Sequence, residues 1–242
     1  MTVDAVTLGL DLAVIALIGG GLSLDRRGAF QFMISQPLVA VPLLGLCLGL
    51  PVEGMKLGAL VQLLWMASSL FGANVPHNET VAGLAIGGMY FLAVRHGEPI
   101  APGVLGAASI LLGAPLCLLG RWAEIQSDRA NMLLARRADT TVRGEHPEHI
   151  ARLPALGLVR TFLLGSGLVT GGAFAGFGLL LALHTPLTTV TLGAALQAVM
   201  VYVVPAVGLG VALSHLRRRR GLVLAGVSFV AALIFLHTGG AG

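Results

Sequence analysis

The stretch GALVQLLWMASSLFGANVPHNETVAGLAIGGMYFLAV, residues 58–94, places a short polar turn between two apolar runs. The turn contains Asn74, Pro76, His77, Asn78 and Glu79. Each flanking run approaches the length of about 20 residues that a helix needs to cross the hydrocarbon core of a bilayer. The pattern predicts two helical segments joined by a polar turn, which is either a solvated loop or a polar site inside a membrane.

The composition of the whole chain is that of a membrane protein. Of its 242 residues, 56% are hydrophobic and 11% are charged, whereas soluble domains carry about 25% charged residues. We therefore expect an all-α membrane protein that forms a single membrane domain over residues 1–242. A nucleic-acid partner is not expected, because the basic residues are mostly arginines between apolar segments rather than on a soluble basic surface.

Apolar segments recur along the chain and predict about six to eight transmembrane helices, including a re-entrant or broken helical hairpin. They cover residues 5–24, 31–50, 54–72, 78–96, 100–120, 155–183, 188–213 and 221–238. Residues 121–154 hold six arginines and five acidic residues, and form the one long polar element. We expect an extramembrane element there, with an interfacial helix from Trp122 to about Ala138 followed by a loop.

Arginines predict the topology. Arg26 and Arg27, the arginines of 121–154 and the run Arg217–Arg220 all fall on one side of the membrane, which the positive-inside bias makes cytoplasmic. Both termini then lie outside. The pair 54–72 and 78–96 either crosses the membrane fully or dips halfway and returns, because both paths bring the chain back to the same face.

The polar turn is a candidate binding site. Polar side chains at membrane depth are costly unless they face a cavity or a partner, and amides with a carboxylate can bind several hydroxyl groups of a sugar. The expected substrate-binding residues are Gln62, Asn74, His77, Asn78 and Glu79, with Gln36 as a further candidate. The alternative is an interfacial loop in which Asn78 or Thr80 caps the next helix.

Other chemistry has less support in the sequence. His77 and Glu79 lack a nearby third ligand for a metal, so neither a metal nor a cofactor is expected. An intramembrane enzyme that uses His77 and Glu79 as base and acid is a remote alternative. It would need a nucleophile or a metal that the sequence does not offer.

The run QPLVAVPLLGLCLGLPVEGMKLGALVQLLWMASSLFGANVPHNETVAG, residues 36–83, resembles the membrane C subunit (enzyme IIC) of the mannose/fructose/sorbose class of bacterial phosphotransferase-system permeases. Three elements carry the resemblance over about 50 residues, in the same order as in that family. They are Gln36-Pro37, then Gly54, Gly58, Ala59, Gln62 and Leu63, then Gly72, Ala73, Pro76, Asn78 and Glu79.

The resemblance implies a sugar-translocating subunit rather than an enzyme. Its expected partners are a D membrane subunit, cytoplasmic A and B subunits that carry the phosphoryl group, a hexose or related sugar, and the lipid bilayer. It also implies an oligomer in the bacterial cytoplasmic (inner) membrane. An uncoupled sugar facilitator or a regulatory membrane subunit is the alternative that the sequence leaves open, and the particular sugar is not assigned.

Overall fold

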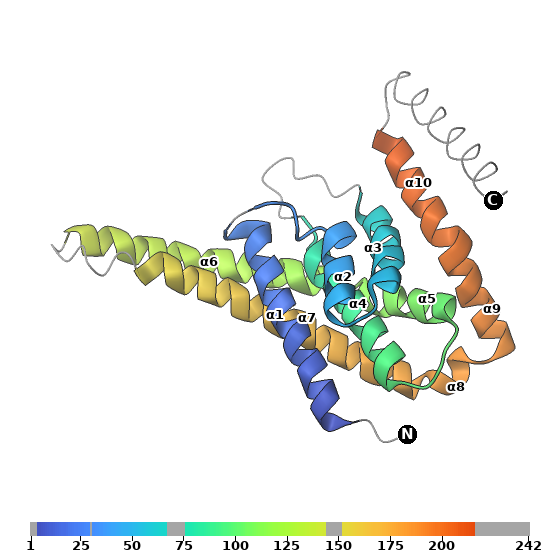
Figure 1. The fold of residues 1–242 in the computed structure, drawn as a ribbon. Helices are drawn as coiled ribbons and strands as arrows, with labels where there is room; N and C mark the ends of the chain where they lie inside the picture. Colours follow the sequence, from blue (N-terminus) through green and yellow to red (C-terminus); the bar gives the residue numbers. More distant parts are fainter. Residues whose placement is uncertain (1–3, 30, 67–75, 144–151, 216–242) are drawn as a thin grey trace, which may run out of the picture.

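The fold is all-α throughout the described part of the chain, residues 4–29, 31–66, 76–143 and 152–215 of a computed structural model. Within these described ranges, four helical stretches are long and apolar enough to cross a membrane: Ala5–Arg27, Pro102–Arg136, Leu153–Ala182 and Val190–Gly210. The elements, shown in Figure 1, are α1 (Ala5–Arg27), α2 (Pro37–Cys47), α3 (Pro51–Trp65), α4 (Glu79–His96), α5 (Pro102–Gly113), α6 (Leu116–Arg143), α7 (Arg152–Ala182), α8 (His184–Leu187), α9 (Val190–Ala198), the π-helix η2 (Val199–Val203) and α10 (Val204–His215).

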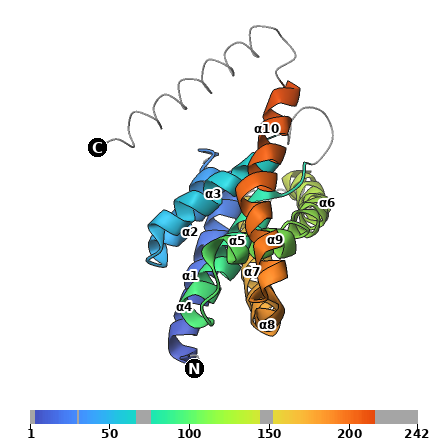
Figure 2. The ribbon, with the colours of Figure 1, turned by 90° about the vertical axis from the view of Figure 1, so that its right-hand side faces the viewer.

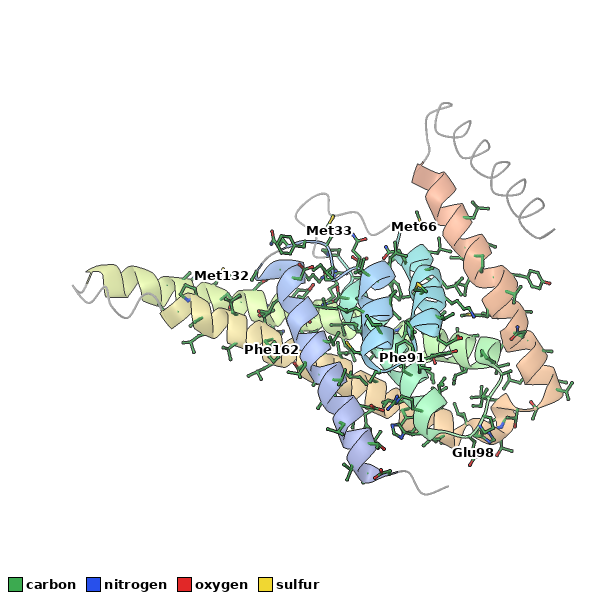
Figure 3. All side chains as sticks on the ribbon, viewed as in Figure 1. Met33, Met66, Phe91, Glu98, Met132 and Phe162 are labelled. Carbon is green, nitrogen blue, oxygen red and sulfur yellow. The ribbon has the colours of Figure 1, made fainter. Side chains whose placement is uncertain are left out.

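Helix α4 forms the centre of the molecule. Every residue from Thr80 to Ala93 is buried, because α1, α2, α3, α5, α6 and α7 all pack against it. Phe91 lies in the middle of this bundle (Figure 3). A helix that is apolar on all sides requires burial on all sides, and the sequence of α4 has this character.

Helices α2 and α3 form a short antiparallel hairpin. At about 1.5 Å per residue, the 11 residues of α2 and the 15 of α3 are both shorter than a membrane crossing. Gly45 and Gly54 allow the close approach, because a Cβ atom on Gly54 would lie 3.0 Å from Pro42 Cα and 3.2 Å from Gly45 Cα. Helix α3 packs chiefly against α2 and α10 and also contacts α4. Residues 67–75, which lie between α3 and α4 in the chain, are outside the described residues.

The segment expected to cross the membrane at 31–50 is shorter than predicted, because residues 31–36 form a turn. Gln31 and Met33 have left-handed backbones, with φ of 53° and 62°. The buried carboxylate of Asp25 holds this turn, since it accepts hydrogen bonds from the backbone N–H groups of Phe32 (2.7 Å) and Ser35 (3.0 Å). The turn fixes where α2 begins.

The segment expected at 100–120 is interrupted between α5 and α6, at Ala114 and Pro115, because proline lacks the N–H of a helical hydrogen bond. Helix α6 then continues to Arg143, so the loop expected after Ala138 begins later than predicted. Helices α6 and α7 lie side by side and extend away from the bundle (Figure 1), and Met132 lies on this extended part of α6 (Figure 3).

Helices α9 and α10 join through the π-helix η2 into one long rod beside the bundle (Figures 1 and 2). The rod packs on α5 near η2 and on α3 along α10. A Cβ atom on Gly208 would clash with Leu63 Cβ, so this glycine allows α10 to approach α3 closely.

Candidate functional site

Asn78 begins α4 and links it to α6. Its Oδ1 accepts a hydrogen bond from Val81 N (2.9 Å), as an N-cap residue does. Its Nδ2 donates to Glu124 Oε1 (3.0 Å). Its backbone N–H donates to the Cys117 carbonyl (3.2 Å), in the first turn after the α5–α6 break. Asn78 therefore caps α4, as the interfacial-loop alternative predicted. Asn78 is buried, however.

Arg26 joins three helices around this start of α4. Its Nε donates to Glu124 Oε1 (2.9 Å) and its Nη1 to Glu79 Oε1 (3.2 Å) and Thr80 Oγ1 (3.4 Å). Its Nη2 donates to the His77 carbonyl (3.0 Å). The side chains of Arg26, Glu79 and Glu124 are only 11, 14 and 12% exposed, so two largely buried carboxylates share one largely buried cation.

Gln36 and Gln62 both lie at the start of α2. Gln36 is the N-cap residue of α2 by its extended backbone, and its carbonyl accepts from Val39 N and Ala40 N. Gln62, from α3, accepts a hydrogen bond from Leu38 N through Oε1 (3.1 Å). Its side chain thereby satisfies one of the N–H groups that have no partner within a helix's first turn.

The starts of α2 and α4 lie next to each other. A Cβ atom on Gly83 would lie 3.1 Å from Pro37 Cγ, and one on Gly87 would lie 3.1 Å from Val41 Cγ1, so the two helices run in the same direction. Gln36, Gln62, His77, Asn78 and Glu79 therefore gather at one end of the bundle. Asn74, which was expected to join them, lies outside the described residues.

A cavity of about 580 Å³ lies on the other side of Asn78, between α1, α6 and α7. We call it the α6–α7 cavity. Polar residues of α1, α6 and α7 line it together with Asn78, the N-cap residue of α4. Among them are Arg26, Glu124, Ser127, Asn131 and Thr161. Glu124 Oε2 and Asn131 Oδ1 are both buried and have no hydrogen-bond partner within the described part of the chain.

Sequence reasoning missed Arg26 and Glu124 as members of this site. Arg26 was interpreted only as a sign of topology, and Glu124 fell in the segment expected outside the membrane. The two residues are 98 positions apart in the chain, and no local pattern indicates that they pair. The sequence gives the charge of each residue, but it does not indicate which residue pairs with which.

A second polar cluster lies at the opposite end of α4. Asp11 Oδ2 lies 2.7 Å from Arg95 Nε and 2.8 Å from His96 Nε2. Arg95 Nη1 also donates to the Leu48 carbonyl at the tip of the α2–α3 hairpin (2.8 Å). Arg95 and His96, at the end of α4, thus have a partner on α1. Among the described residues, no group of three His, Cys, Asp or Glu side chains is placed to hold a metal ion.

Comparison with known proteins identifies the fold and the family. The family described as "PTS system sorbose-specific iic component" matches residues 6–239. A solved structure described as a membrane protein superposes with a TM-score of 0.68 at 18% identity, covering 99% of this chain and 93% of the other. A mannose transporter ManYZ, solved with microcin E492, superposes with a TM-score of 0.54 at 18% identity and the same coverage. No curated protein matches the chain.

Proposed function

Because the chain belongs to the sorbose-specific IIC family of the phosphotransferase system, we propose that it binds a hexose or related sugar where α2 and α4 begin and carries it across the membrane. The chain is a multi-pass membrane protein and a sugar-transport subunit. The proposal goes beyond this family-level role, because it names where the sugar binds and which residues bind it.

The observation that carries the proposal is the gathering of Gln36, Gln62 and Glu79 around two adjacent helix starts. The N–H groups of a first helical turn can donate to sugar oxygens, and a helix that begins inside a membrane protein is a common binding element. Amide and carboxylate oxygens accept from sugar hydroxyls. His77, which is exposed, and Asn74 complete the proposed set.

The proposed partners follow from the family. In this proposal a D membrane subunit assembles with the chain in the bacterial cytoplasmic membrane, and the assembly is an oligomer. Cytoplasmic A and B subunits carry the phosphoryl group and transfer it to the sugar, so the chain itself forms no phosphorylated intermediate. The similar fold of a mannose transporter supports this proposal at the level of architecture.

Sugar uptake tests the proposal. Transport-deficient bacteria would express the chain with its D, A and B subunits and receive radiolabelled D-mannose, D-fructose or L-sorbose. We expect Gln62→Ala to reduce uptake at least tenfold and Gln62→Glu to preserve it, because Glu retains the oxygen that caps α2. The matched control is Gln126→Ala, since Gln126 lies on α6 and bonds only Arg129 (3.4 Å) among the described residues.

Two results would contradict the proposal. The first is uptake that remains at the wild-type level in Gln62→Ala and in Glu79→Gln, with normal amounts of protein in the membrane. The second is the absence of uptake of every sugar tested by the complete assembly. Separating free from phosphorylated sugar inside the cells distinguishes coupled transport from a facilitator.

A further inference from the structure

The α6–α7 cavity contains two hydrogen-bond acceptors that no protein group satisfies. Glu124 uses Oε1 for both Arg26 and Asn78, which orients the carboxylate and leaves Oε2 buried without a partner. Asn131 Oδ1 is also buried and has no hydrogen-bond partner among the described residues. A buried acceptor without a donor is costly and is uncommon in native proteins, so a ligand that carries donors would stabilise both groups.

The spacing of the two acceptors limits the kind of ligand. Glu124 and Asn131 are seven residues apart on α6, which is about 10 Å along the helix. Because the two residues lie two turns apart, a ligand that satisfies both acceptors presents hydrogen-bond donors at two separate positions. A sugar ring carries hydroxyl donors at several positions around the ring, whereas an ammonium group presents all of its donors at one nitrogen.

The remaining lining suits a sugar as well. Ser127 lies between Glu124 and Asn131 on the same face of α6 and also lines the cavity. Ala123, Leu158 and Leu164 line the cavity too and can pack against the C–H groups of a sugar. The cavity volume of about 580 Å³ is within the usual range for small-molecule sites.

We infer that the α6–α7 cavity is a second sugar-binding site, in which Glu124 and Asn131 accept hydrogen bonds from hydroxyl groups at opposite ends of the sugar. This inference rests on the proposed function, because the ligand is the transported sugar. Asn78 connects the two sites, since it caps α4 beside the first site and also lines the cavity.

Equilibrium binding to the purified full-length chain tests the inference, with radiolabelled D-mannose, D-fructose and L-sorbose as probes. We expect Asn131→Leu to weaken binding at the second site about tenfold. Asn131→Asp keeps the acceptor and should bind within about threefold of wild type. Gln126→Leu, on α6 but not lining the cavity, is the matched control and should match wild type. Sugar binding measured on a Gln62→Ala chain reports the second site alone, because Gln62 belongs to the first site.

The outcomes separate this inference from the proposed function. If wild type transports a sugar but Asn131→Leu and Glu124→Gln bind it as wild type does, the second site is wrong while the first stands. If neither binding nor uptake occurs with any sugar, the proposed function fails. A lipid that copurifies with wild type and is lost from Asn131→Leu, with sugar binding unchanged, would show that the cavity holds a lipid and overturn the inference.

Discussion

Arg26 links helices that are far apart in the sequence. Its guanidinium group reaches Glu79, Thr80 and the His77 carbonyl on the α4 side, and Glu124 on α6. The planar geometry of arginine allows several directed hydrogen bonds at once, which the point charge of lysine does not. The start of α4 is therefore held in place by one side chain of α1.

Replacement of Arg26 should destabilise the fold strongly. Arg26→Met leaves two largely buried carboxylates without their cation, and breaking a buried ion pair in this way costs about 3–5 kcal/mol. We expect a clear fall in the thermal unfolding midpoint of the purified chain in detergent. The added change Glu124→Gln should recover part of the loss, because it removes one of the unpaired charges.

The control for Arg26 is Arg129→Met. Arg129 is exposed on α6 and bonds Gln126 at 3.4 Å, so its loss should leave the unfolding midpoint nearly unchanged. An Arg26→Met chain as stable as the Arg129→Met chain would mean that the interactions around the start of α4 contribute little to stability.

At the scale of the element, the α2–α3 hairpin depends on glycine for close packing. Gly54 faces the backbone of α2, where an added Cβ atom would lie 3.0 Å from Pro42 Cα and 3.1 Å from the Val41 carbonyl oxygen. Backbone atoms of a packed helix cannot move aside as a flexible side chain can. The hairpin places Gln36 and Gln62 together, so its packing also supports the proposed binding site.

Gly54→Ala should therefore lower both stability and transport. Overpacking of this kind costs about 1–3 kcal/mol, which should appear as a lower unfolding midpoint and reduced sugar uptake. Gly171→Ala in α7 is the control, because nothing lies within 4 Å of its added Cβ atom, and alanine favours a helix over glycine by about 1 kcal/mol. Equal unfolding midpoints and equal sugar uptake in the two variants would show that α2 and α3 can move apart without loss of stability or transport.

Across the whole molecule, α1 holds α4 at both ends. Arg26 binds the start of α4, and Asp11 binds Arg95 and His96 at its end. Glu79 and Arg95 are 16 residues apart on α4, which separates the two clusters by about 24 Å. The second cluster also holds the tip of the α2–α3 hairpin through Arg95 and the Leu48 carbonyl.

The two clusters should act independently on stability. We expect Asp11→Asn and Arg26→Met each to lower the free energy of unfolding, and the double variant to lower it by their sum within about 0.5 kcal/mol, as for distant sites that share no partner. Denaturant unfolding of the four proteins in detergent measures this cycle. A coupling energy well above 1 kcal/mol would show that α4 transmits strain between its ends.

Several features of the fold were predictable because they depend on local sequence. The apolar runs predicted the long helices, but the start of α2 at Pro37 was not predicted, because the expected segment began at residue 31. Helix lengths were less predictable, since Gln31 and Met33 adopt left-handed backbones that their residue types do not indicate. The close packing of α3 on α2 depended on small residues such as Gly45 and Gly54 at the helix crossing, which hydrophobic periodicity does not locate.

The sequence by itself determined the all-α membrane class and, through the motifs of residues 36–83, the family. Burial of apolar helices and local turn residues are properties of single segments, so they can be recognised without knowing what each segment contacts. Only the tertiary structure decided that Arg26 pairs with Glu79 and Glu124, that α2 and α4 begin side by side, and that Glu124 and Asn131 line one cavity. These relations join residues far apart in the chain, and the packing of the helices determines which of them meet.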